Sequence, residues 1–253
     1  MTEEGLYKLS LTKIKEVYKQ RFANPGAFTF IFVGNIDLKT AKPLIEKYIG
    51  GLTGNVKENF KDLNRFPVKG LVKNHFQRPM KVEKATVNII YSGEMAYSPE
   101  KAMAMSYLTR ILRIRYVEEI REKRGGTYGA GVSGSINTLP KETFSLRVSF
   151  DTDPKMKEEL VGVVYDEIKK IADNGPLPDD FQKTESNMKS QYEQNLKENS
   201  YWTNTLYSYY FDGKDTHNTW LRAFSKTNAK AVQDFANEIL KQKNIIEVVM
   251  LPE

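Results

Sequence analysis

The stretch of this sequence best suited to chemistry runs from Arg121 to Gly131, and it reads Arg-Glu-Lys-Arg-Gly-Gly-Thr-Tyr-Gly-Ala-Gly. Its glycine pair, at positions 125 and 126, follows the last residue of an apolar helical pattern, and glycine commonly ends a helix. An alternating, strand-like run then begins at Thr127 and Tyr128. A sharp reversal at the glycines would bring the Arg121 guanidinium and the Tyr128 phenol together, a pair suited to holding a peptide carbonyl.

Spacing alone favours a plainer interpretation of this pair. A helix-end arginine interacts favourably with the helix dipole, and a half-buried tyrosine is common in strands. Nearby, Glu118, Glu119 and Glu122 lie beside several arginines, and paired surface charges account for them without acid–base roles.

No self-sufficient catalytic set accompanies the pair. The two histidines, His75 and His217, show no His-x-x-x-His or His-x-x-Glu-His spacing, and a lone histidine is more often a surface or packing residue than a ligand. A zinc site would have to rely largely on carboxylates, which zinc sites rarely do. Cysteine is absent, so thiolate chemistry and disulfides are excluded. The sequence contains no Gly-x-Ser-x-Gly elbow, and its glycine-rich run follows a helix rather than a strand, the reverse of a nucleotide fingerprint. We expect no metal in this chain.

Composition sets wider limits. The chain has 253 residues and a net charge of +6, with lysines spread along its length. A solvated basic surface explains this charge better than a nucleic-acid or membrane-surface partner. No apolar run approaches eighteen residues, so we expect no membrane span. The acidic, polar N-terminus predicts no secretory signal, although a longer parent protein leaves that open.

The elements expected around the pair alternate between helix and strand. Apolar periodicity and capping residues predict helices over 9–22, 38–49, 153–172 and 228–241, and a long helix from 98 that ends at the Arg121–Tyr128 stretch. A further helix is expected from 178, with a continuation to 210 as the longer alternative. Strands are expected over 28–33, 127–137, 142–150 and 245–250, with a strand pair at 70–76 and 84–91. The aromatic cluster between Tyr201 and Tyr210 is interpreted as core packing rather than a base-stacking surface.

A weak internal repeat divides the chain. The helix opening at Thr12 and the strand 28–33 resemble the helix opening at Thr227 and the strand 245–250. We therefore expect residues 1–52 to be the closing helix–strand–helix of a preceding related domain, 53–68 to be a linker, and 69–253 to be one complete domain.

The segment ending at Tyr128 resembles the C-terminal domain of the pitrilysin/insulinase family of zinc metallopeptidases. The family pattern is Arg-Glu-x-x-Gly, a small run and then tyrosine, with arginine and tyrosine seven positions apart, which Arg121 and Tyr128 match. Where many members have Gly-Leu-Ala-Tyr, this chain has Gly-Gly-Thr-Tyr. Other agreeing segments are Phe28–Asp37, Ile90–Glu94, Ser98–Glu100 and Asn174–Leu177.

The resemblance implies an α+β fold, a two-layer sandwich of a mostly antiparallel sheet with helices packed on one face. In that family a homologous domain binds zinc through His-x-x-Glu-His, and the second, metal-free domain closes on it. The family motif for zinc is absent here, so the chain resembles the substrate-clamping half. Arg121 and Tyr128 would bind the peptide substrate, with Tyr128 supporting the oxyanion, and the zinc would lie on the partner domain.

The resemblance predicts that this chain alone is inactive as a peptidase. The alternative function is a proteolytically inactive scaffolding subunit of a related complex, and a His-x-x-Glu-His in the parent reading frame or a neighbouring gene would favour the peptidase. Besides the zinc-bearing domain and a peptide, a second copy of this chain is a candidate partner. The resemblance and the lack of cysteine favour a bacterial envelope or periplasmic location, with the cytoplasm as the alternative.

Overall fold

A five-stranded sheet forms the centre of the fold. The computed structural model describes residues 3–54, 63–64, 66–127 and 129–253. The strands are β1 (Leu71–Arg78), β2 (Ala85–Glu94), β3 (Gly131–Asn137), β4 (Thr143–Thr152) and β5 (Ile245–Pro252). Their order across the sheet is β1-β5-β2-β4-β3, and only the β1–β5 contact is parallel. The predicted α+β class and the mostly antiparallel sheet are therefore confirmed.

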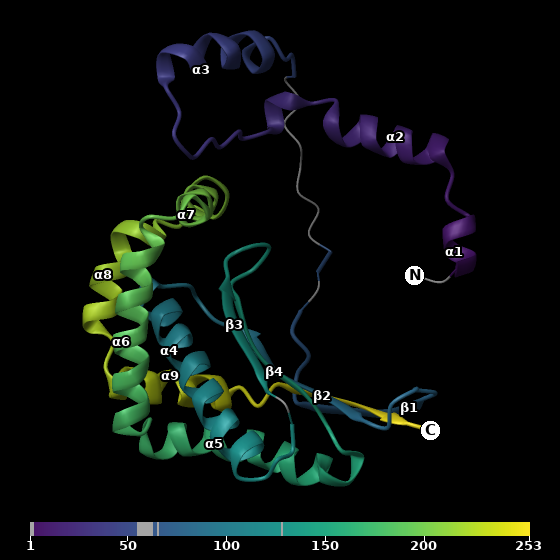
Figure 1. The fold of residues 1–253 in the computed structure, drawn as a ribbon, viewed down its shortest axis with the longest axis vertical. Helices are drawn as coiled ribbons and strands as arrows, with labels where there is room; N and C mark the ends of the chain where they lie inside the picture. The colour runs from purple at the N-terminus through teal and green to yellow at the C-terminus, as the bar shows by residue number, and fades with distance from the viewer. Residues whose placement is uncertain (1–2, 55–62, 65, 128) are drawn as a thin grey trace.

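Helices cover one face of this sheet (Figure 1). They are α4 (Pro99–Tyr116), α5 (Lys157–Asn174), α6 (Pro178–Asn195), α7 (Asn199–Asp212), α8 (Thr216–Lys226) and α9 (Ala229–Lys241). Helix α4 begins where the sequence predicts, because the Ser98 hydroxyl accepts a hydrogen bond from the Lys101 amide at 3.1 Å and Pro99 follows the cap.

The sheet places its apolar side chains toward these helices. Along β4 every second residue from Phe144 to Thr152 is buried, as strand geometry requires. Leu108, Ile111 and Leu112 of α4 pack into the same core and are fully buried. Burying a side chain of this size stabilises the fold by about 1.5–3 kcal/mol. The core therefore holds α4, and with it the Arg121 segment, against the sheet.

The expected pairing of the first two strands is wrong. Strand β5 lies between them, parallel to β1 and antiparallel to β2. The apolar run Ile245–Met250 can be buried on both sides in a central strand, whereas β1 is exposed along most of its length. The C-terminal strand thus completes the sheet from its middle, and β1 becomes an edge.

The N-terminal segment consists of short helices that stand apart from the sheet (Figure 1). They are α1 (Glu3–Tyr7), α2 (Leu11–Phe22), a 3-10 turn (Pro25–Ala27), α3 (Leu38–Ile45) and a π-helical turn (Glu46–Gly50). Ser10 caps α2 and Asp37 caps α3, because their side chains accept hydrogen bonds from the amides of Lys13 and Thr40. None of these elements buries a residue within the described chain.

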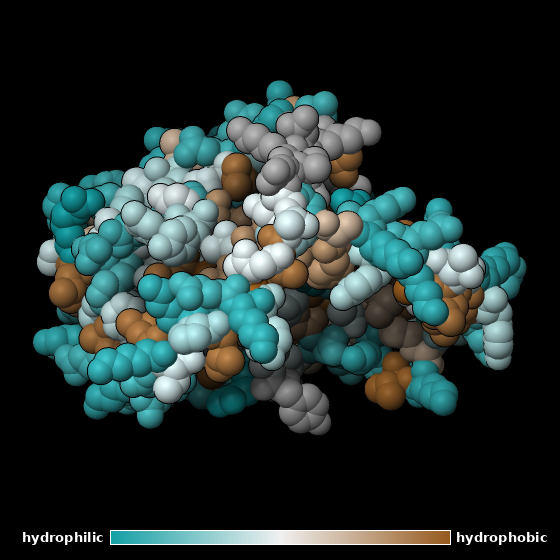
Figure 2. Space-filling model, turned by 90° about the horizontal axis from the view of Figure 1, so that it is seen from above, coloured by the Kyte–Doolittle hydropathy of each residue, from teal (hydrophilic) through white to brown (hydrophobic). Residues whose placement is uncertain are grey.

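The strand predicted at 28–33 does not form. Phe28, Phe30 and Phe32 are exposed, and within the described residues no strand lies beside this segment. A strand gains its stability from a neighbouring ladder and from burial, and the described chain offers neither here. Figure 2 shows exposed apolar side chains among polar ones at this end of the molecule.

The interpretation of the aromatic cluster as core is wrong for α7, which has no buried residue. The predicted long helix is interrupted at Leu196, which caps the end of α6. The Leu196 carbonyl accepts a hydrogen bond from the Trp202 indole at 2.9 Å. Tyr207, Tyr209 and Tyr210 are more than half exposed. Helix α8, which the sequence analysis did not predict, follows α7. The π-stacked Tyr192 and Trp220, with ring centroids 3.9 Å apart, connect α8 to α6.

Candidate functional site

The candidate site begins where α4 continues into a π-helical turn, Val117–Glu122. After this turn the Gly125 amide donates to the Arg121 carbonyl and the Gly126 amide to the Ile120 carbonyl, both at 2.9 Å. Such paired bonds satisfy carbonyls that the end of a helix leaves free. π-Helical turns within α-helices occur frequently at functional sites. The predicted glycine stop is therefore confirmed in position and in type.

The two positions of the glycine pair favour glycine for different physical reasons. Gly125 has φ +61°, a left-handed backbone conformation that residues other than glycine and asparagine rarely adopt. At Gly126 a β-carbon would lie 2.6 Å from Cδ1 of Leu160 in α5, so any larger residue would require the buried Leu160 side chain to shift. The turn is consequently pressed against the helix layer rather than loose on the surface.

Arg121 lies at this turn with much of its side chain in solvent. Its side chain is 50% exposed, and Nη2 lies 3.3 Å from Oε1 of Glu122, which is itself exposed. An ion pair between two exposed groups is weak, so the guanidinium fork remains available to a ligand. Tyr128, the other predicted clamp residue, lies outside the described residues. The structure therefore leaves the predicted meeting of Arg121 and Tyr128 a prediction.

A charged network stiffens the same turn. The Glu119 carboxylate is 12% exposed and contacts Arg115, Lys123 and Arg124 at 2.8, 2.7 and 3.1 Å. Hydrogen bonds from Lys123 and Arg124 hold the pKa of Glu119 below its ordinary value. The interpretation of Glu118, Glu119 and Glu122 as paired surface charges thus holds for Glu122 but not for Glu119, which organises a half-buried network.

This network reaches two buried acids that sequence reasoning missed. Arg115 contacts Glu167 of α5 at 3.0 Å and Asp180 of α6 at 3.6 Å, and both carboxylates are almost fully buried. Burial raises the pKa of Asp180. The spacing of Arg115, Glu118 and Glu119 by three and four residues could have predicted the local part. The distant acids gave no such signal, because only tertiary packing brings them to Arg115.

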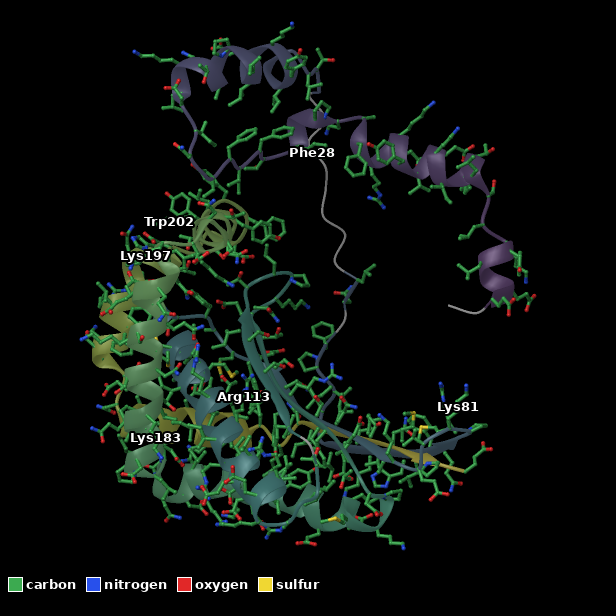
Figure 3. All side chains as sticks on the ribbon, viewed as in Figure 1. Phe28, Lys81, Arg113, Lys183, Lys197 and Trp202 are labelled. Atoms are coloured by element: carbon green, nitrogen blue, oxygen red, sulfur yellow. The ribbon has the colours of Figure 1, made fainter. Side chains whose placement is uncertain are left out.

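A cavity of about 560 Å³ opens beside the glycine turn. Three segments line it: the Val82–Lys84 end of the β1–β2 connection, Gly125–Thr127, and Asp151–Asp153 at the end of β4. Lys81, which precedes the first segment, lies at the tip of that connection, far from Trp202 of α7 (Figure 3). The cavity therefore shares the segment Gly125–Thr127 with the turn that carries Arg121. Its three lining segments lie far apart in the sequence, so local sequence patterns could not predict it.

The histidines lie in separate settings. His75 Nε2 lies 2.8 Å from Oε1 of the buried Glu247, and His217 Nδ1 lies 2.9 Å from the Tyr201 hydroxyl. Within the described part of the chain, no group of three or more metal-binding side chains comes together. These residues do not fit a zinc ion. No described helix is long and apolar enough to cross a membrane.

A family model described as the peptidase M16 inactive domain matches residues 8–188. The chain is 26% identical over 216 residues to a zinc protease PQQL-like protein of Arabidopsis thaliana, a match that covers 79% of this chain and 22% of that protein. A probable zinc protease PqqL of Haemophilus influenzae is 22% identical over 178 residues, which are 69% of this chain and 19% of that protein. The chain thus spans about a fifth of the length of these curated relatives.

Solved structures share the fold. The periplasmic protease PqqL of Escherichia coli superposes with a TM-score of 0.79 at 18% identity, covering 100% of this chain and 28% of that one. A peptidase M16 inactive domain from Pseudomonas fluorescens superposes with a TM-score of 0.72 at 18% identity, covering 97% of this chain and 58% of that one. At these identities the likeness establishes the fold alone.

Proposed function

The chain belongs to the family of peptidase M16 inactive domains, and from this we propose that it is the substrate-clamping half of a zinc metallopeptidase. A homologous partner domain would hold the zinc, either on the same longer polypeptide or on a separate subunit. The residues of this chain would bind and orient an unfolded peptide against that domain. The proposal concerns only what these residues do, since they do not fit a zinc ion themselves.

The observation that carries the proposal is the exposed Arg121 guanidinium on a rigid turn. Hydrogen bonds from both glycine amides and the charges around Glu119 fix the backbone there. Arginine presents several donors in a fixed fork, which suits the carbonyl groups of an extended peptide. A donor that is held in place before the ligand arrives loses less entropy on binding.

Tyr128 follows this turn directly in the sequence, and we assign it the second contact. Its phenol would donate a hydrogen bond to the carbonyl oxygen of the peptide bond as negative charge develops there. Removing one such donor typically costs about 3–4 kcal/mol of transition-state stabilisation. In this division of roles Arg121 sets the register of the peptide, and Tyr128 supports its reacting carbonyl.

The domain organisation proposed with this function explains the N-terminal segment. Residues 1–52 would close a preceding homologous domain, 53–68 would link the two, and 69–253 would form the clamp domain. In this organisation helix α2 and the segment 28–33 would be the counterparts of α9 and β5, and β5 lies between two other strands. The exposed phenylalanines of 28–33 would gain the same central position in the partner's sheet.

The test uses this chain assembled with its zinc-bearing homologous domain and an unfolded peptide substrate. We expect Tyr128→Phe to lower turnover about 100-fold or more. Arg121→Ala should lower turnover and also raise KM. The amount of bound zinc per assembly should be unchanged in both variants. Arg222→Ala, on an exposed arginine of α8, is the matched control and should match the unmodified protein. Full turnover in both clamp variants would refute the clamp, and an assembly that forms without any cleavage would favour the scaffolding alternative.

A further inference from the structure

We propose that the cavity beside the glycine turn is a specificity pocket for a basic side chain of the peptide, lysine or arginine. This rests on the proposed clamp function and adds the class of substrate residue to it. The cavity is about 560 Å³, a size within the range of ligand pockets. It shares the segment Gly125–Thr127 with the turn that carries Arg121. A peptide on Arg121 would therefore place a neighbouring side chain at its mouth.

The charge of the lining selects a cation. The three segments around the cavity carry Glu83, Asp151 and Asp153 against a single lysine, Lys84, so the lining is negative on a chain whose net charge is +6. A negative recess on a positive surface concentrates cations and disfavours acidic ligands.

The four charges are not equally occupied. Lys84 Nζ lies 2.6 Å from one oxygen of Asp151, and the Thr86 hydroxyl donates to the other at 2.6 Å. Both oxygens of Asp151 are thus engaged within the protein. Among the residues that the structure describes, Glu83 has no hydrogen bond or ion pair, and its side chain is exposed. One oxygen of Asp153 accepts a hydrogen bond from the Lys155 amide at 2.8 Å. Glu83 is therefore the least engaged of the three carboxylates and the one that a ligand cation would meet first.

One further feature suits a long basic side chain. Val82 is 64% exposed beside Glu83 and offers apolar contact to a methylene stem. The carboxylate and the aliphatic contact together match lysine or arginine.

The test is a binding measurement on two peptide series. One series moves a single lysine along a neutral, fluorescein-labelled peptide, and the other replaces that lysine with norleucine. Affinity is measured by fluorescence anisotropy, with EDTA present to prevent hydrolysis, for the chain and for its assembly with the zinc-bearing domain. We expect lysine to bind about two- to fivefold more tightly than norleucine at one position, the range for a partly exposed ion pair.

Variants separate the pocket from the clamp. Glu83→Gln should remove the preference for lysine, whereas Glu193→Gln, an exposed carboxylate of α6 away from the cavity, should keep it. Arg121→Ala should weaken both peptides and leave their ratio unchanged. Equal binding of the two series, or a lysine preference that survives Glu83→Gln, overturns the pocket while the clamp stands. If lysine peptides still bind more tightly than norleucine peptides but Arg121→Ala weakens neither, the clamp is overturned and the pocket stands. If neither series binds, both proposals are overturned.

Discussion

Arg124 binds Glu119 twice: its Nη1 atom donates to the main-chain carbonyl at 2.7 Å and to the carboxylate at 3.1 Å. Its Nε atom donates to Glu159 of α5 at 2.8 Å. One arginine therefore satisfies a carbonyl at the end of the helix and connects that end to the neighbouring helix. Cations also interact favourably with the negative end of the helix dipole at this point.

This relationship explains how a turn with two glycines can remain rigid. Glycine gives the chain the reversal, but it gives no side chain to hold it. The network around Glu119 supplies the missing constraint from both sides, through Arg115 in α4 and Arg124 after the turn. The position of Arg121 should therefore depend on Glu119, although the two side chains make no direct contact.

Glu119→Gln is expected to destabilise the fold by about 1–3 kcal/mol, because it leaves hydrogen-bonding cations without their shared carboxylate. Peptide affinity should fall with it, since the turn that carries Arg121 loosens. Urea unfolding and anisotropy on the same preparation measure both effects. Glu122→Gln is the control, because its only described partner is Arg121 in an exposed pair, and it should change stability by less than about 0.5 kcal/mol. Equal effects of the two variants would contradict the network's role.

Gly125→Ala should cost about 1–2 kcal/mol of stability, because alanine is strained at φ +61°. Apart from Gly125 and its two chain neighbours, no atom of the described residues lies within 4 Å of an added β-carbon there, so the cost is conformational and not steric. Gly125→Asn should lose less, since asparagine tolerates the left-handed region. The midpoints of thermal unfolding of the three proteins give the comparison. A higher midpoint for Gly125→Ala than for Gly125→Asn would show that backbone strain at position 125 is not the cause.

This turn could be predicted from the sequence because the residues that determine it are close neighbours in the chain. The Ser98 cap, the apolar spacing along α4 and the Gly125 stop each act within a few residues, and the structure has all three. Capping and chain reversal depend on nearby backbone groups, so neighbouring residues are sufficient to predict them.

The errors share a different cause. The strand at 28–33 and the core position of Tyr209 were predicted from apolar and aromatic content, but burial depends on which surface lies opposite. The insertion of β5 between β1 and β2, and the ion pair of Arg115 with Glu167, join residues far apart in the sequence. The cavity at Gly125–Thr127 likewise arises from three separated segments. No window of neighbouring residues contains that information.

Glu247→Gln should change how stability depends on pH. Burial alone would raise the pKa of Glu247, but hydrogen bonds from Tyr165, His75 and Lys73 outweigh it, so the pKa lies below its ordinary value. A carboxylate whose pKa is lowered by folding adds stability above its unfolded pKa, about 4.3, and loses it as pH falls through the folded value. The variant should therefore be about 1–3 kcal/mol less stable at pH 7.

The difference between the two proteins should narrow as pH falls below about 4.3, when the native carboxylate also becomes protonated. Urea unfolding at a series of pH values measures it. Glu193→Gln, an exposed carboxylate, is the matched control and should follow the unmodified protein at every pH. A difference between Glu247→Gln and the unmodified protein that stays constant from pH 7 to strongly acidic solution would show that the glutamate stabilises by packing rather than by charge.

Deuterium exchange of the backbone amides in segment 28–33 should slow when a partner domain is present, whereas exchange in β5 should not change. In this chain Phe30 and its neighbours have no adjacent strand within the described residues, so their amides should exchange with deuterium about as fast as an unfolded peptide. The amides of 245–250 lie between β1 and β2 and should be protected. When the preceding homologous domain is present, the proposed strand would be paired on both sides, and its amides should become protected as well.

Phe30→Ser should weaken that protection, whereas Thr29→Ser, a smaller change in the same segment, should preserve it. If 28–33 exchanges rapidly in the presence of the domain, the segment does not complete its sheet, and the proposed boundary at residue 52 is wrong.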